Sequence, residues 1–173
     1  MENIRLFSLF LSAPSDVTEE HEIIAGVIDD WNIQHGRAAK IRVELVYWRT
    51  HTHPASGGRP QALINKQAFD KSDIVTGIFW SKFGTPTGRY GSGTEEELQR
   101  GIRKGKKVMV YFCRRPAPGM KPLERSKIGK FKAKLGKKAL YWEYSDLIPF
   151  ERDFRNHLAM VMQELQKTRK VRK

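Results

Sequence analysis

The chain has one cysteine and no long apolar segment, and these two shortages exclude several classes of protein. Cys113 has no second cysteine with which to form an intrachain disulfide, and a single thiol cannot by itself anchor a zinc site. No apolar run approaches the roughly 18 residues of a membrane-spanning helix, so no membrane partner is expected. The apolar stretch near the N-terminus is interrupted by polar residues, which favours a buried strand over a secretory signal. We therefore expect a cytoplasmic protein.

Common phosphate-binding and nucleophile motifs are also missing. The glycine-rich segment 84–94 has neither the lysine of a Walker loop nor the GxGxxG spacing of dinucleotide-binding folds. A GxSxG nucleophile elbow does not occur anywhere. His51 and His53 provide two imidazoles without a convincing third ligand. We therefore expect neither a metal ion nor a bound cofactor.

The basic residues are concentrated in the second part of the chain. The net charge is +13, yet residues 1–100 carry 11 Lys and Arg against 13 Asp and Glu. Residues 101–173 carry 21 against 6, mainly in a segment at 114–138 and in a predicted C-terminal helix and tail at 150–173. This asymmetry is typical either of a solvated surface or of weak binding to a polyanion such as a nucleic acid.

Apolar, strand-like runs alternate with helical patterns along the chain. The predicted strands are residues 5–12, 41–48, 73–80, 107–113 and 139–144, and the predicted helices are residues 15–35, 61–71, 94–104 and 150–170. Nearly continuous apolar strands separated by helices indicate a parallel sheet covered on both faces. We expect a single α/β domain over residues 1–173, a flavodoxin-like three-layer sandwich with strand order 2-1-3-4-5.

Ligands of such sheets bind beyond the carboxyl ends of the strands, at the switch point between the first and third strands. The loop at 81–93 begins there, contains four glycines and leads into a helix with Thr94 and three consecutive glutamates in its predicted first turn. Backbone N–H groups and the helix dipole favour anions at such a position. We therefore expect a carboxylate there to be ionised.

Several segments resemble known families. Ser92-Gly-Thr-Glu-Glu-Glu-Leu98, followed by residues 101–108, resembles the GT-x-x-E helix start of nucleoside 2-deoxyribosyltransferases. The same helix start is similar to the catalytic helix of Toll/interleukin-1 receptor (TIR) domains, in which a glutamate is followed directly by a hydrophobic residue. Together with residues 10–16 and 79–86, it makes the chain resemble the TIR-like domains of bacterial defence proteins over about residues 5–145.

This resemblance implies cleavage of an N-glycosidic bond in antiphage defence or signalling, with NAD as the typical substrate and nicotinamide as the released base. Glu97 matches the catalytic carboxylate of the family, and Glu96 is the alternative because the glutamates are adjacent. An ionised carboxylate would stabilise the oxocarbenium-like ribose. TIR-like sites are often completed by a neighbouring copy, so we expect a homo-oligomer when active. The expected substrate-binding residues are Ser12, Ser15, Asp16, Trp80, Phe83, Ser92 and Thr94.

Other interpretations of the same residues remain open. The chain could be a nucleoside or nucleotide glycosidase or deoxyribosyltransferase, or a non-enzymatic, self-associating interaction module. Thr94 and Glu97 have the spacing of a capping box, which would make Glu97 a structural residue. Ser15 and Asp16 could be N-caps of the first helix. Trp80 and Phe83 could belong to the core.

Overall fold

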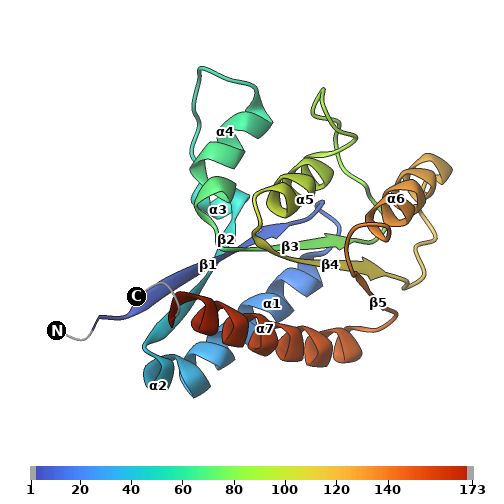
Figure 1. Cartoon of the computed structure of the whole chain (residues 1–173). Helices are drawn as coiled ribbons and strands as arrows, with labels where there is room; N and C mark the ends of the chain where they lie inside the picture. Colours follow the sequence, from blue (N-terminus) through green and yellow to red (C-terminus); the bar gives the residue numbers. More distant parts are fainter. Residues whose placement is uncertain (1–2, 171–173) are drawn as a thin grey trace.

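Five parallel strands form one sheet in a computed structural model that describes residues 3–170. They are β1 (Arg5–Ser12), β2 (Ile41–Tyr47), β3 (Ile74–Phe79), β4 (Lys107–Cys113) and β5 (Trp142–Tyr144). The strands lie in the order β2-β1-β3-β4-β5, and every neighbouring pair is parallel. The predicted flavodoxin-like topology is therefore confirmed (Figure 1).

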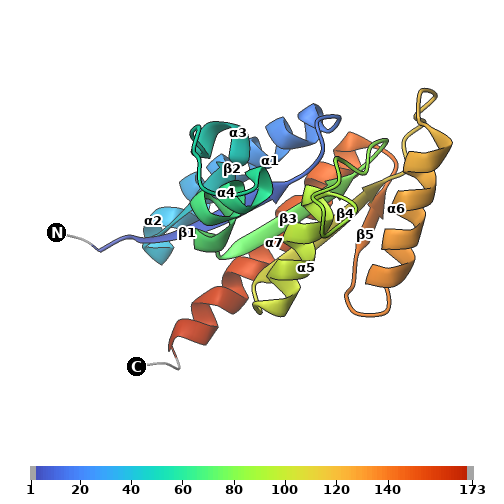
Figure 2. The same ribbon diagram turned by 90° about the horizontal axis from the view of Figure 1, so that it is seen from above.

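Two layers of helices cover the two faces of this sheet (Figures 1 and 2). One face packs against α1 (Thr18–Trp31) and α7 (Leu147–Lys170), and the other against α4 (Pro60–Gln67), α5 (Gly93–Arg103) and α6 (Pro122–Leu135). The alternation of β1 explains the two cores, because successive side chains of a strand point to opposite faces. Leu9 packs with the α1 and α7 side, whereas Phe10 packs with the α4, α5 and α6 side.

The first helix begins later than predicted and has no side-chain cap. Val17 is the residue before its first turn, and neither Ser15 nor Asp16 caps it, so the N-cap interpretation of both residues is wrong. Beyond Trp31 the chain continues through a π-helical segment, Asn32–Gly36, and the short helix α2 (Arg37–Ala39). Lys40 then adopts a left-handed conformation with φ of 54°, which ends the helix before β2.

Strand β5 is shorter than predicted, and its first predicted residue is instead bonded to the end of α6. The backbone N–H of Ala139 donates to the carbonyl of Leu135 and is not available for pairing with β4, and the observed strand begins at Trp142. Helix α7 begins at Leu147, earlier than predicted, and the predicted loop after β2 begins with the short helix α3 (Trp48–His51). The basic segment at 114–138 contains α6, and the last part of the basic tail, 171–173, lies outside the described residues.

Helix α5 lies close to β3, and a glycine in the strand makes this approach possible. A methyl group at Gly77 would lie 2.6 Å from both terminal carbons of Leu98, a distance that real side chains do not adopt. Leu98 is fully buried against the sheet at this point. The residue before it on α5 is Glu97, so the same close approach brings that carboxylate to the end of β1.

We expect Gly77→Ala to lower the free energy of unfolding by about 1–3 kcal/mol, because Leu98 must shift within a packed core. Gly129→Ala on α6 is the matched control, since a methyl group there would meet nothing within 4 Å. Alanine is the better helix former, so the control should be neutral or slightly stabilising. Urea denaturation measures both changes. Equal stability of Gly77→Ala and the unmodified protein would contradict the tight packing.

Candidate active site

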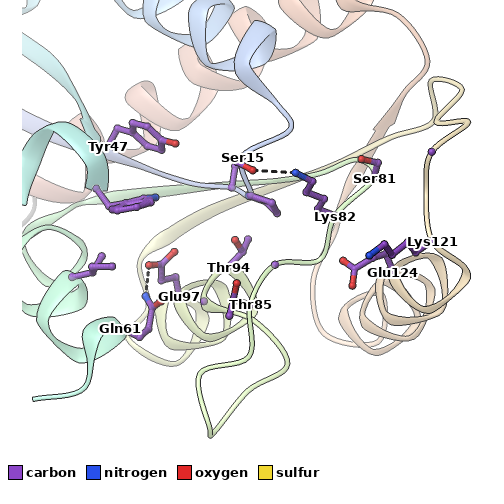
Figure 3. A pocket seen from close by; sticks show the side chains of 17 residues that line it. Ser15, Tyr47, Gln61, Ser81, Lys82, Thr85, Thr94, Glu97, Lys121 and Glu124 are labelled. Carbon is purple, nitrogen blue, oxygen red and sulfur yellow. Dashed lines mark hydrogen bonds between the residues drawn. The ribbon is translucent and has the colours of Figure 1, made fainter.

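A cavity of about 580 Å³ lies at the carboxyl ends of β1, β2 and β3, which is the predicted switch point. Its wall combines segments from six parts of the chain: the ends of β1, β2 and β3, helices α4 and α5, and the start of α6 (Figure 3). The residues used below are Ser15, Tyr47, Trp48, Gln61, Ile64, Lys82, Gly93, Thr94, Glu97, Lys121 and Glu124.

Glu97 is the buried carboxylate of this cavity. It is 5% exposed, and both of its oxygens accept hydrogen bonds from other elements. The hydroxyl of Ser12, at the end of β1, donates to Oε2. The amide of Gln61, on α4, donates to Oε1 over 2.7 Å, as Figure 3 shows. The carboxylate is therefore held in one orientation at the junction of three elements.

Burial raises the pKa of Glu97 from 4.5 to about 7, although the hydrogen bonds from Ser12 and Gln61 act in the opposite direction. The nearby charge of Glu96 raises this pKa further. The predicted ionisation of a first-turn carboxylate does not extend to Glu97, because Glu97 lies beyond the first turn of α5 and is removed from water. Near neutral pH the carboxyl group is instead divided between its two protonation states.

The three consecutive glutamates have different surroundings. Glu95 accepts a hydrogen bond from the backbone N–H of Gly91 over 2.9 Å. Glu96 forms a two-pronged ion pair with Arg59, with distances of 2.7 and 3.0 Å, and also accepts from Thr87. Burial tends to raise the pKa of Glu96, but these partners outweigh it and hold that pKa below its usual value. Only Glu97 of the three lines the cavity.

Helix α5 is capped by a different residue from the one predicted. The side chain of Ser92 accepts a hydrogen bond from the N–H of Glu95 over 3.1 Å, so α5 begins at Gly93. The capping box of Thr94 and Glu97 is therefore wrong, and Glu97 is free to face the cavity. Ser92 is fully buried as the cap, whereas Thr94 lines the cavity. The sequence contains the same Ser/Thr-x-x-Glu spacing two residues earlier, and the structure uses that one.

Asp16 connects the loops that follow β1 and β3. One of its carboxylate oxygens accepts from the N–H and the hydroxyl of Ser81, over 2.8 and 2.9 Å, and from the N–H of Lys82 over 3.0 Å. Its neighbour Ser15 lines the cavity and accepts from the ammonium group of Lys82 over 3.3 Å. Asp16 thus shapes the cavity from outside, and Ser15 and Lys82 form part of its wall.

The two predicted aromatic contacts lie outside the cavity wall. Trp80 donates its ring N–H to the carbonyl of Arg115, and the guanidinium group of Arg115 lies 4.7 Å from the centre of the indole. Phe83 is 3% exposed and stacks on Phe79 within the core. Packing explains both residues in this structure.

Several cavity residues were not predicted from the sequence. Gln61 and Ile64 come from α4, and nothing in the sequence indicates that this short helix lies over the start of α5. Lys121 comes from the segment before α6, and nothing in the sequence indicates that this segment reaches the cavity. The pair Tyr47–Trp48 was the available signal, because aromatic residues at the carboxyl end of a strand beside the switch point commonly meet the ligand.

The cavity has aromatic and apolar residues in one part of its wall and two lysines and Glu124 in another. Tyr47 lies on the same side as Glu97 and Gln61, whereas Lys121 and Glu124 lie together on the opposite side (Figure 3). Lys82 points into the space between them, and neither lysine is paired with a carboxylate within the described residues. Such a cavity can hold a ligand with an aromatic ring at one end and a negative charge at the other.

Neither a metal site nor a membrane-spanning helix is found among the described residues. Among residues 3–170, no group of three or more His, Cys, Asp or Glu side chains is arranged to hold a metal ion. None of the helices in that range combines the length and the apolar character needed to cross a membrane.

Three solved structures are similar to the chain at low sequence identity. Rubredoxin oxygen:oxidoreductase from Desulfovibrio gigas is 10% identical with a TM-score of 0.47; the match covers 96% of this chain and 38% of the oxidoreductase chain. Oxidised flavodoxin 1 from Bacillus cereus is 16% identical with a TM-score of 0.41, covering 92% and 97%. The TIR domains of the activated Roq1 resistosome, which recognises the pathogen effector XopQ, are 14% identical with a TM-score of 0.39, covering 90% and 84%. These likenesses are too distant to inform the activity, and the strand order itself establishes the fold.

No curated protein matches the sequence significantly. A family model does match: the domain of unknown function DUF4062 covers residues 9–159, a range that includes every residue of the cavity wall. The chain therefore belongs to the DUF4062 family.

Proposed function

We propose that this chain is a TIR-like NAD+ hydrolase that breaks the N-glycosidic bond to nicotinamide, in bacterial defence or signalling. One observation is the main support for this proposal. A single buried carboxylate, Glu97, lines a cavity at the switch point of a flavodoxin-like sheet, held by Ser12 and Gln61 and with its pKa raised to about 7 by burial. A carboxylate beside the reacting sugar can stabilise the oxocarbenium-like transition state of glycosidic cleavage.

The two ends of the cavity fit the parts of a dinucleotide. A base can pack against Trp48 and Ile64, and the ribose that it leaves would then lie against Glu97. The phosphates extend away from the ribose, toward the ammonium groups of Lys82 and Lys121. A volume of about 580 Å³ is within the usual range for ligand sites of this size class.

The main requirement of the reaction is one negative charge placed beside the ribose. The bond from the ribose C1′ to the nicotinamide nitrogen breaks, and its electron pair leaves with the neutral base. The ribose then carries positive charge, which the ionised Glu97 stabilises. Water adds to C1′ and releases a proton. Because only the ionised form of Glu97 can stabilise this charge, the rate should rise with pH through about 7 and then level off.

The test is to incubate the protein with NAD and with a panel of nucleosides and nucleotides, over a range of protein concentrations and pH values, and to separate the products by chromatography. We expect free nicotinamide and ADP-ribose, formed faster at pH 8 than at pH 6. Release of another base from a nucleoside or nucleotide, without nicotinamide from NAD, would support the glycosidase alternative. Absence of any released base at every concentration would contradict an enzymatic role and favour the interaction module.

A further inference from the structure

We infer that Gly93 and Gln61 act together as positioning residues, because the missing side chain at the first residue of α5 leaves the space through which Gln61 reaches Glu97. The inference rests on the proposed function, since it concerns the carboxylate assigned to the reaction there. It adds that Gly93, in the Gly-rich segment, leaves room for the side-chain amide of Gln61.

The geometry at Gly93 excludes any side chain while Gln61 is in place. A methyl group on Gly93 would lie 2.3 Å from Oε1 of Gln61 and 3.1 Å from its Cδ, and Cβ atoms do not approach other atoms to 2.3 Å. The backbone of Gly93 does not itself require glycine. The glycines with positive φ are elsewhere, at Gly57, Gly84, Gly88 and Gly105. A side chain at position 93 therefore requires the Gln61 amide, the end of a flexible side chain, to move from its place beside Glu97.

Gln61 is placed by the anchoring of α4 on α5. Its amide also donates to Asn65, one turn further along α4, over 3.3 Å. Asn65 is 1% exposed and donates in turn to Glu96 of α5 over 3.2 Å. The same Glu96 is held by Arg59, the residue immediately before α4. The side chain of Gln61 thus extends from α4, which these bonds already attach to α5.

A donor at this position favours the ionised form of Glu97. The Gln61 amide donates to Oε1 over 2.7 Å, which opposes the effect of burial on the carboxylate. Loss of the donor should make Glu97 harder to ionise, and a side chain at position 93 should have the same effect by displacing the amide. The other ionisable side chains around Glu97 are Glu96 and Arg100 on α5, Tyr47 at the end of β2, and Lys82, Lys121 and Glu124 across the cavity.

Carboxyl carbon-13 NMR titration of glutamate-labelled protein tests this without any substrate. The Glu97 signal is assigned from its loss in Glu97→Gln. In Gln61→Met the pKa of Glu97 should rise by about one unit or more, the effect of losing a hydrogen bond to a charged group. Gly93→Ala should raise it in the same direction, although alanine is otherwise acceptable in a helix. The double variant should show no more than the effect of Gln61→Met alone. Gly129→Ala, where a methyl group meets nothing, should leave the titration unchanged.

Two results would overturn the inference. One is an unchanged Glu97 titration in Gln61→Met, and the other is full additivity of the Gly93→Ala and Gln61→Met effects, which would show that they act separately. Circular dichroism of each variant confirms that it is folded, and Gly93→Ala and Gln61→Met provide independent tests should one of them not fold. If the unmodified protein releases no base, the proposed function fails while the titration still decides this inference. If it does release a base, the rising part of each pH–rate profile should move with the pKa from NMR.

Discussion

Replacement of Glu97 by glutamine is expected to slow base release by about 100- to 1,000-fold and, at pH 8, to make the folded protein more stable. Glutamine has nearly the same shape and can keep the contacts with Ser12 and Gln61, but it has no charge to stabilise the developing positive ribose. Loss of one well-placed electrostatic group in an active site typically lowers the rate by about 100- to 1,000-fold. Product chromatography under identical conditions measures the loss.

The gain in stability follows from the raised pKa of Glu97. In the unfolded chain the carboxyl ionises near 4.5, and in the folded protein near 7. Its contribution to stability is therefore fully present below about pH 4.5 and is lost as the pH rises through about 7. At pH 8 the buried charge costs about 3 kcal/mol, which Glu97→Gln would recover. At pH 4.5 the two proteins should unfold at similar temperatures, and at pH 8 the variant should unfold at a higher one.

The control for this experiment is Glu95→Gln. Glu95 does not line the cavity, and glutamine can still accept the hydrogen bond from the N–H of Gly91. Activity and the pH dependence of unfolding should both stay close to those of the unmodified protein. Glu96→Gln is less suitable, because it disturbs the ion pair with Arg59 that anchors α4. Full activity in Glu97→Gln would show that the reacting carboxylate lies elsewhere.

Replacement of Arg115 by methionine is expected to lower the free energy of unfolding by about 3–5 kcal/mol, because it leaves a buried carboxylate uncompensated. Glu20 is fully buried on α1, and its Oε1 accepts from Arg115 over 2.6 Å and from the Tyr144 hydroxyl over 2.6 Å. The guanidinium group also bonds Glu19 and lies over Trp80. The pair thus fastens the segment after β4 to the start of α1.

A double variant distinguishes loss of charge compensation from loss of packing. Glu20→Gln combined with Arg115→Met removes both charges and should recover much of the stability, as is common for buried ion pairs. Arg155→Met is the surface control, since Arg155 pairs with Asp30 and Glu151 at exposed positions, and it should cost less than about 1 kcal/mol. Urea denaturation measures all three. A loss at Arg115 no larger than that at Arg155 would contradict the importance of the buried pair.

The start of α5 shows why local patterns were insufficient for the site. Ser92-x-x-Glu95 and Thr94-x-x-Glu97 have the same spacing, and both are compatible with a helix start. The structure uses the first because Leu98 must face Gly77 on β3, which turns Glu97 toward Ser12 on β1. The choice between two equivalent caps was therefore made by packing across the sheet.

The sequence by itself determined the order of strands and helices, the parallel sheet, its strand order and the edge at which the cavity lies. These follow from hydrophobic periodicity and from connection rules, which depend on neighbours along the chain. Only the tertiary structure decided the direction of the pKa shift of Glu97, the role of Gln61 and the arrival of Lys121 at the same cavity. Desolvation and hydrogen bonding at this site arise between segments tens of residues apart, and their magnitude depends on distances that only packing sets.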